Sequence, residues 1–181
     1  MTPTETLRHE HEIILLALGG IERGAGSLRV TLARDPAWLD TIVDLAHNFV
    51  DRCHHGKEER HLFVRLMERG IPSAGGPIGV MLREHEQGRA FMRAVAEATP
   101  DAKAGDAAAL EAAREGLRAY AELLQGHIAK ENDALFVLVD QVLTPQDQID
   151  LEAAFEWVEA EEMGEGTHER YHQLAHELGK H

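Results

Sequence analysis

The chain has few residues of several kinds, and each shortage narrows the class of protein. Its 181 residues include a single cysteine, Cys53, so no disulfide can form within the chain. This agrees with a reducing compartment. Aromatic residues make up only 5% of a chain that is 44% hydrophobic and rich in Ala, Leu and Glu, a composition that suits helices better than sheets. We expect one all-α domain over residues 1–181.

Long apolar runs and basic residues are also scarce. No apolar stretch approaches the ~20 residues that a membrane-spanning helix needs, and residues 1–12 lack the basic start and hydrophobic stretch of a secretion signal. The chain has 18 Lys and Arg against 32 Asp and Glu, and its formal net charge of −14 argues against nucleic-acid and anionic membrane partners. We therefore expect a cytoplasmic protein with no nucleic-acid and no membrane partner.

What the chain does have is one pattern of histidine and glutamate that occurs twice. The triplet Glu-His-Glu surrounds His11 and, again, His85. Each triplet is followed by a histidine that has a glutamate four residues later, and these pairs are His54 with Glu58 and His127 with Glu131. The spacing between the two triplets and the spacing between the two pairs differ by one residue. The order indicates a duplicated two-helix unit.

Capping and breaking residues divide the chain into helices. They predict long helices at about 2–34, 35–70, 77–99 and 106–142, with loops at 70–77 and 100–105. Thr144, with Pro145 and Asp147 after it, is close to a capping box and starts two shorter helices that are split by Gly164 and Gly166. Long helices with short links favour an antiparallel up-down four-helix bundle over residues 3–142, with a helical extension over 144–181.

The repeated residues are typical metal donors. Residues i and i+4 lie one above the other on a helix, so each His-Glu pair can offer one nitrogen and one oxygen to a single site. Apolar residues at helical spacing accompany His85 and His127, which indicates that both side chains point inward. Burial of four imidazoles and two carboxylates without a cation would cost several kcal/mol per uncompensated charge. The sequence therefore predicts a metal centre with donors enough for two ions.

The repeated motifs resemble those of a known family. The segments that carry the resemblance are EH at 10–11, CHHGKEERHLF at 53–63, EHEQGR at 84–89 and HIAKENDALF at 127–136. In this order they are similar to the four motifs of the hemerythrin-like, or HHE cation-binding, proteins. The segment GEGTHERYH at 164–172 also resembles bacterial members, so the resemblance covers nearly the whole chain.

The resemblance implies a four-helix bundle that holds two non-haem irons. Carried over by position, the terminal ligands would be His11, His54, His85 and His127, and the carboxylates that bridge the irons would be Glu58 and Glu131. Two nitrogens and two bridging carboxylates fill four positions on each iron. This leaves room for an oxo or hydroxo bridge and for one exchangeable small ligand. The same donors also accept manganese or zinc.

The chain departs from the oxygen-carrying hemerythrins at two positions. Where their pattern has a second histidine on the third helix this chain has Arg89, and where the fourth-helix motif ends in aspartate it has Asn132. Fewer nitrogen donors favour the ferric state, which argues against reversible oxygen carriage. Two further histidines remain open as additional ligands. They are His55, which has Glu59 four residues later, and His168, in a tail that can fold over the end of the bundle.

Two functions fit these expectations. The first is a di-iron protein of oxidative defence or iron handling that binds or reacts with dioxygen, hydrogen peroxide or nitric oxide, with catalase- or peroxidase-like peroxide breakdown as its enzymatic form. The second is a non-catalytic oxygen or iron sensor, storage protein or carrier, in which the segment 164–172 moves with metal occupancy. A purely structural helical scaffold would leave the repeated donors unexplained.

Overall fold

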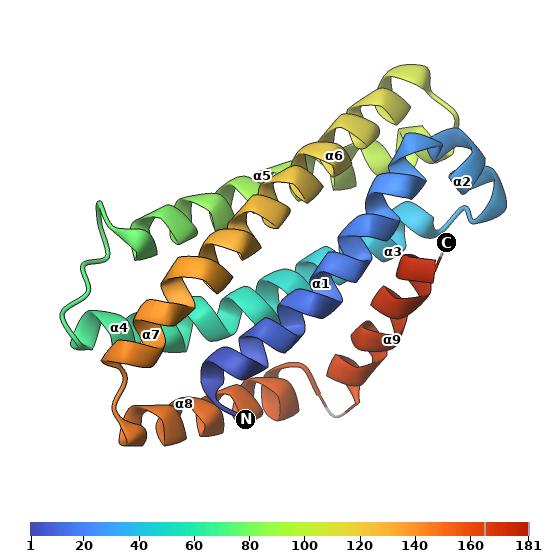
Figure 1. Ribbon diagram of the computed structural model, residues 1–181. Helices are drawn as coiled ribbons and strands as arrows, with labels where there is room; N and C mark the ends of the chain where they lie inside the picture. The colour runs from blue at the N-terminus through green and yellow to red at the C-terminus, as the bar shows by residue number, and fades with distance from the viewer. Residues whose placement is uncertain (165, 181) are drawn as a thin grey trace.

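The computed structural model describes residues 1–164 and 166–180. Every regular element in this part of the chain is helical, which confirms the all-α prediction (Figure 1). None of these helices is both long and apolar enough to cross a membrane. The α-helices are α1 (Pro3–Gly26), α2 (Leu28–Arg34), α3 (Trp38–Leu45), α4 (Phe63–Glu68), α5 (Pro77–Lys103), α6 (Ala107–Lys130), α7 (Phe136–Val142), α8 (Pro145–Trp157) and α9 (Thr167–Lys180). The π-helical segments are η1 (Ala46–His55), η2 (Glu58–Leu62), η3 (Glu131–Leu135) and η4 (Val158–Glu162).

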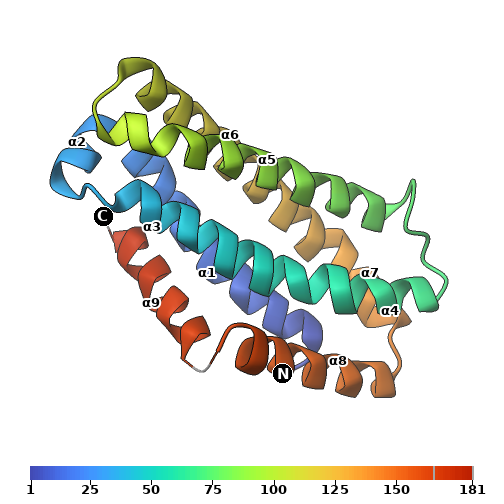
Figure 2. The same ribbon diagram turned by 180° about the vertical axis from the view of Figure 1, so that it is seen from behind.

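The helices join into long rods that lie side by side (Figures 1 and 2). One rod runs from α3 through η1 and η2 to α4, and another runs from α6 through η3 to α7. These two rods lie beside α1 and α5, and successive rods run in opposite directions. The C-terminal helices α8 and α9 pack on the outside, where α9 follows α1.

Several helix ends lie where the sequence predicts them. Thr2 and Thr144 each form a capping box, in which the side chains of residues at the first turn satisfy free backbone N–H groups. The side chain of Asp106 accepts a hydrogen bond from the third residue of α6. Gly70 and Gly105 follow α4 and α5 with φ of 90°, a conformation that only glycine adopts at low cost.

Other helix ends differ from the prediction. The first predicted helix is divided at Ser27, and the third continues through Pro100 to Lys103 instead of ending at Thr99. Pro100 cannot donate to the carbonyl of Ala96, but Ala96 is exposed, so water can satisfy that carbonyl. The proline therefore fits into the last turns of α5.

The apolar core consists of two clusters with a polar layer between them. The large cluster contains Ile14, Phe49, Met92 and Leu124, and the small cluster contains Leu7, Leu62, Met81 and Leu135. On each of the four rods the histidines and glutamates of the repeat lie between a residue of one cluster and a residue of the other. The polar layer is thus enclosed by apolar side chains at both ends, which keeps it away from solvent.

The close approach of α1 and α9 depends on Gly20. A Cβ atom at this position would overlap the backbone carbonyl of Leu178, whereas a Cβ atom at Gly26 would meet no atom within 4 Å. We predict that Gly20→Ala lowers the free energy of unfolding by about 1–3 kcal/mol, because α9 must move away from α1.

Thermal unfolding and amide hydrogen exchange in α9 would measure this effect, with Gly26→Ala as the control that leaves both unchanged or slightly improved. Equal behaviour of the two variants would contradict the packing of α9 on Gly20.

Candidate metal centre

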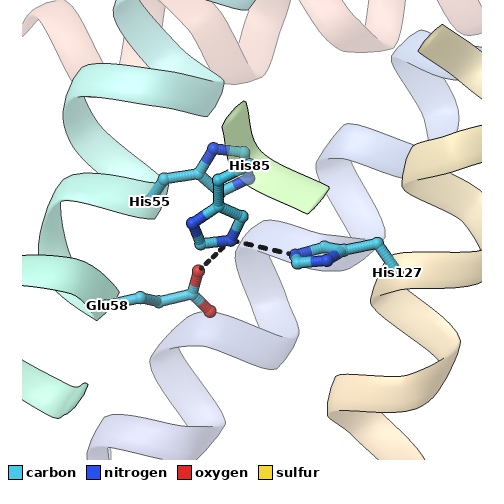
Figure 3. A group of neighbouring side chains, drawn as sticks. All are labelled: His55, Glu58, His85 and His127. Carbon is cyan, nitrogen blue, oxygen red and sulfur yellow. Dashed lines mark hydrogen bonds and ion pairs between the residues drawn. The ribbon is translucent and has the colours of Figure 1, made fainter. Parts of the chain in front are cut away.

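Seven buried side chains from four rods form two donor groups. The two-histidine group consists of His11, His54, Glu58 and Glu131, and the three-histidine group consists of His55, Glu58, His85 and His127. Within each group one donor atom of every residue lies within 4.8 Å of the others. Figure 3 shows the three-histidine group, in which His55 and Glu58 come from one rod and converge with His85 of α5 and His127 of α6. Glu58 belongs to both groups, so the two groups are adjacent.

The two glutamates lie between the two sets of histidines. The oxygens of Glu58 face different groups, since Oε1 is 3.7 Å from Nε2 of His54 and Oε2 is 3.4 Å from Nε2 of His85. For Glu131 a single oxygen, Oε2, lies 3.1 Å from Nε2 of His11 and 3.3 Å from Nε2 of His127. Each carboxylate therefore contacts one histidine of either group, an arrangement that suits carboxylates shared by two cations.

Most of these donor atoms have no hydrogen bond. The buried atoms without one are Nε2 of His11 and His54, Nδ1 of His55, and both carboxylate oxygens of Glu58 and of Glu131. In addition, Nε2 of His85 and Nε2 of His127 face each other at 3.1 Å (Figure 3). Unpaired polar atoms are costly in an apolar interior. Nitrogens and carboxylate oxygens that converge in this way fit divalent transition metals, which would satisfy them together.

A second ring of polar residues fixes the orientation of four of the histidines. In each of these histidines Nδ1 forms a hydrogen bond with an oxygen, so that Nε2 faces the centre. The partners are Glu10 for His54 at 2.8 Å, Glu84 for His127 at 3.0 Å, Glu59 for His85 at 2.7 Å and Asn132 for His11 at 2.9 Å. Such partners of ligand histidines raise the basicity of the ring and fix its tautomer.

The second ring is duplicated in the same way as the sequence. Glu10 and Glu84 come directly before the first histidine of each repeat, and each also pairs with a lysine, Lys57 or Lys130. The rings of His11 and His54 are 4.7 Å apart with an interplanar angle of 62°, and the rings of His85 and His127 have the same distance and angle. The repeat in the sequence is therefore a repeat in the structure.

His55 breaks this symmetry. When the repeats are aligned at Lys57 and Lys130, His55 corresponds to Ile128, so only one half of the centre gains a third histidine. The ring of His55 stacks on that of His85 at 3.8 Å. Burial and then the neighbouring histidines lower the pKa of His55 well below its ordinary value. His55 is thus neutral and keeps a lone pair for a metal.

The π-helical segments explain how two successive histidines both point inward. In the rod from α3 to α4, the N–H of Gly56 bonds to the carbonyl of Asp51, and that of Phe63 bonds to the carbonyl of Glu58. These hydrogen bonds reach five residues back, so each turn holds more residues than an α-helical turn. Segments of this kind are frequent at functional sites. An interpretation based on α-helical spacing alone does not detect them.

His168 lies outside both donor groups. Its Nε2 is 3.0 Å from Oε1 of Glu10, and it forms a third group with Glu10 and Cys53. The other oxygen of Glu10 binds His54, so the tail contacts the centre through one carboxylate. Lys57, fully buried, lies 2.5 Å from both Glu10 and Glu159. Burial alone would lower the pKa of Lys57, but Glu10 and other nearby groups raise it, so the lysine stays charged.

Sequence reasoning did not assign roles to Glu10, Glu84, Lys57 or Lys130. The signal was present, because the two glutamates belong to the repeated triplets and the two lysines occupy the same place in both His-Glu pairs. The sequence does not show that these residues touch, because Glu10 and Lys57 lie on different rods.

The comparisons with known proteins agree with this geometry. Residues 2–139 match the family described as Hemerythrin HHE cation binding domain, and the chain belongs to this family. The resemblance seen in the motifs is thereby confirmed. Membership and the two donor groups together define a metal-binding protein.

The relatives with similar sequences are longer than this chain. An uncharacterized protein of Mycobacterium tuberculosis and one of Mycobacterium bovis are each 24% identical to it over 165 residues. The matched region covers 91% of this chain and 64% of either relative, so the chain spans less than two thirds of their length. No solved structure matches the chain.

The donor groups predict that protons and metal compete for the same atoms. Burial alone would lower the pKa of His85, but the nearby carboxylate of Glu58 and a hydrogen bond with Glu59 raise it to about 9. A metal must displace this proton. We predict that the affinity of the metal-free protein for Zn²⁺ rises as the pH increases from 7 to 9, and that binding releases protons.

Calorimetric titrations in buffers of different ionisation enthalpy would count the protons. The affinity rises with pH because the folded protein stabilises the protonated form of His85, and this proton is lost as the pH rises through about 9. An affinity independent of pH over this range would contradict the competition.

Proposed function

We propose that this protein holds two non-haem irons in the two donor groups, inside an antiparallel four-helix bundle, and that it binds or reacts with small oxidants. The oxidants are dioxygen, hydrogen peroxide and nitric oxide, and peroxide breakdown is the enzymatic form that we propose. The observation that carries the proposal is the position of Glu58 and Glu131, each in contact with one histidine from either side.

The donor sets assign each residue a role. His11 and His54 would hold one ion, and His55 with His85 and His127 would hold the other. When bound, such an iron pair supplies one-electron steps on each ion and an open position for a small ligand. The two-histidine group provides one nitrogen fewer, so an ion held there would have more room for a small ligand.

The surrounding residues bury the donor side chains of the centre. The donors are nearly inaccessible to solvent, and Phe136 stacks on His11 at 5.3 Å while Phe63 stacks on His85 at 6.0 Å. The carboxylates of Glu58 and Glu131 are fully buried beside imidazole rings. A change in metal charge would therefore interact strongly with these two carboxylates, because the dielectric constant of the interior is low.

The presence of His55 in the donor set also changes one argument from the sequence. The prediction against reversible oxygen carriage assumed four histidines, whereas the two groups contain five. A carrier therefore belongs among the functions that experiments need to separate.

The first test is metal content. We predict two irons per chain in protein purified from its own host, with loss of both in Glu58→Ala, because both groups share this carboxylate. In His55→Ala the affinity of the three-histidine group for its ion should fall by roughly 10- to 100-fold, while the other ion stays bound. Losses of this size are typical when a metal site loses a hydrogen-bond partner of a ligand. Elemental analysis and a near-ultraviolet charge-transfer spectrum measure both effects.

The matched control is Glu12→Ala, which removes an exposed glutamate from the first triplet. It should retain both ions. Full metal content in Glu58→Ala would contradict the shared carboxylate, and a single ion in the unchanged protein would contradict the pair.

The second test separates the functions. We predict multiple turnovers of hydrogen peroxide by the iron-loaded protein, measured as oxygen release or as oxidation of an added electron donor, and their loss in Glu58→Ala. A reversible spectral change with dioxygen and no peroxide turnover would instead identify a carrier.

A sensor is the second candidate, and one contact favours it. Glu10 joins His168 of the tail to His54 of the centre, so a change at the two-histidine group would reach α9 through this carboxylate. Metal-dependent hydrogen exchange in α9 without turnover of any oxidant would identify this function.

A further inference from the structure

A cavity of about 330 Å³ opens beside the three-histidine group. It lies between the rod from α3 to α4 and helix α5, and Tyr120 of α6 also lines it. Buried side chains at its inner end include His55 and His85, and exposed ones at its outer end include His47 and Ala96. The cavity therefore leads from the surface to two of the candidate ligands.

This space is too large for the small oxidants alone. A water molecule occupies about 30 Å³ of liquid, and a cavity of about 150 Å³ accommodates benzene. A volume of about 330 Å³ fits an organic molecule with on the order of ten non-hydrogen atoms. The lining is mainly apolar and includes Val43, Ala46 and Met92, which suits an apolar body.

One polar group in the cavity lacks a partner. Tyr120 is 3% exposed, and its hydroxyl forms no hydrogen bond within residues 1–164 and 166–180. The hydroxyl oxygen is not completely enclosed by protein atoms. Because the side chain of Tyr120 lines the cavity, the hydroxyl faces it. Burial, and then the charge of Asp51, raises the pKa of Tyr120. The hydroxyl is therefore protonated at neutral pH and can donate.

The charged groups of the cavity already have partners. Arg89 lies 2.8 Å from Asp51 and 2.7 Å from Glu59, and at the outer end Arg93 lies 3.5 Å from Glu86. A charged ligand would have to break one of these pairs, whereas an uncharged one would not.

We propose that this cavity binds a small uncharged organic molecule with an apolar body and one oxygen that accepts a hydrogen bond from Tyr120. Because His55 and His85 lie at the inner end, the bound molecule would stand beside the metal centre, and its role as an organic substrate of that centre rests on the proposed function. The binding itself does not.

The test uses two inert probes of nearly equal shape, 2-phenyl-2-propanol and isopropylbenzene, titrated calorimetrically into the metal-loaded protein. Only the alcohol has an acceptor oxygen. We expect the alcohol to bind more tightly, and Tyr120→Phe to weaken the alcohol by about 3- to 10-fold while the hydrocarbon is unaffected, as for one lost hydrogen bond.

A second variant tests the location. Ala96→Trp places a large ring at the exposed outer end and should abolish binding of both probes. Matched controls are Ala94→Trp, at an exposed position of α5 outside the cavity, and Tyr171→Phe, which removes a hydroxyl bonded to Asp44. Both controls should bind like the unchanged protein.

Three results would overturn the proposal. They are no binding of either probe, equal binding by Ala96→Trp, and equal weakening of both probes by Tyr120→Phe. The proposed function is judged separately by metal content and peroxide turnover, so a protein that binds iron but not the alcohol would refute this inference alone.

Discussion

The structure depends on two carboxylates held between histidines in an apolar interior. Glu58 and Glu131 have no hydrogen bond among the described residues, and neither is exposed. Burial of such charges opposes folding unless cations or protons compensate it. In the metal-free chain the neighbouring histidines provide part of this compensation. Burial raises the pKa of Glu131, but His127 and His11 beside it lower this pKa below its ordinary value. A pair of metal ions would take over this compensation.

The duplication explains why the hydrogen bonds that orient the histidines occur in pairs. The same contacts occur twice because one two-helix unit occurs twice, and each unit orients the histidine of the other. Glu59 of the first unit binds His85 of the second, and Asn132 of the second unit binds His11 of the first. A change in one half therefore alters ligand orientation in the other half.

The sequence predicts the helices and the donors better than it predicts their surroundings. Periodicity and caps locate α1 and α8, and the repeated spacing selects His11 and His127, because these signals are local. The inward position of His55 depends on π-helical turns, for which the sequence offers no local pattern. A buried Lys57 is equally hard to predict, since lysine is almost never fully buried unless a partner from a distant helix neutralises it.

The two donor groups differ most in the parts of the protein that surround them. The two-histidine group is covered by the C-terminal helices, where His168 contacts Glu10 and the charge of Lys57 is buried. The three-histidine group instead borders a cavity that reaches the surface beside Tyr120. Ile128 stands at the position in the second repeat that corresponds to His55, so the donor group with more nitrogens borders the cavity. The duplication therefore places two similar donor groups in unlike environments, one in contact with the tail through Glu10 and the other beside the cavity.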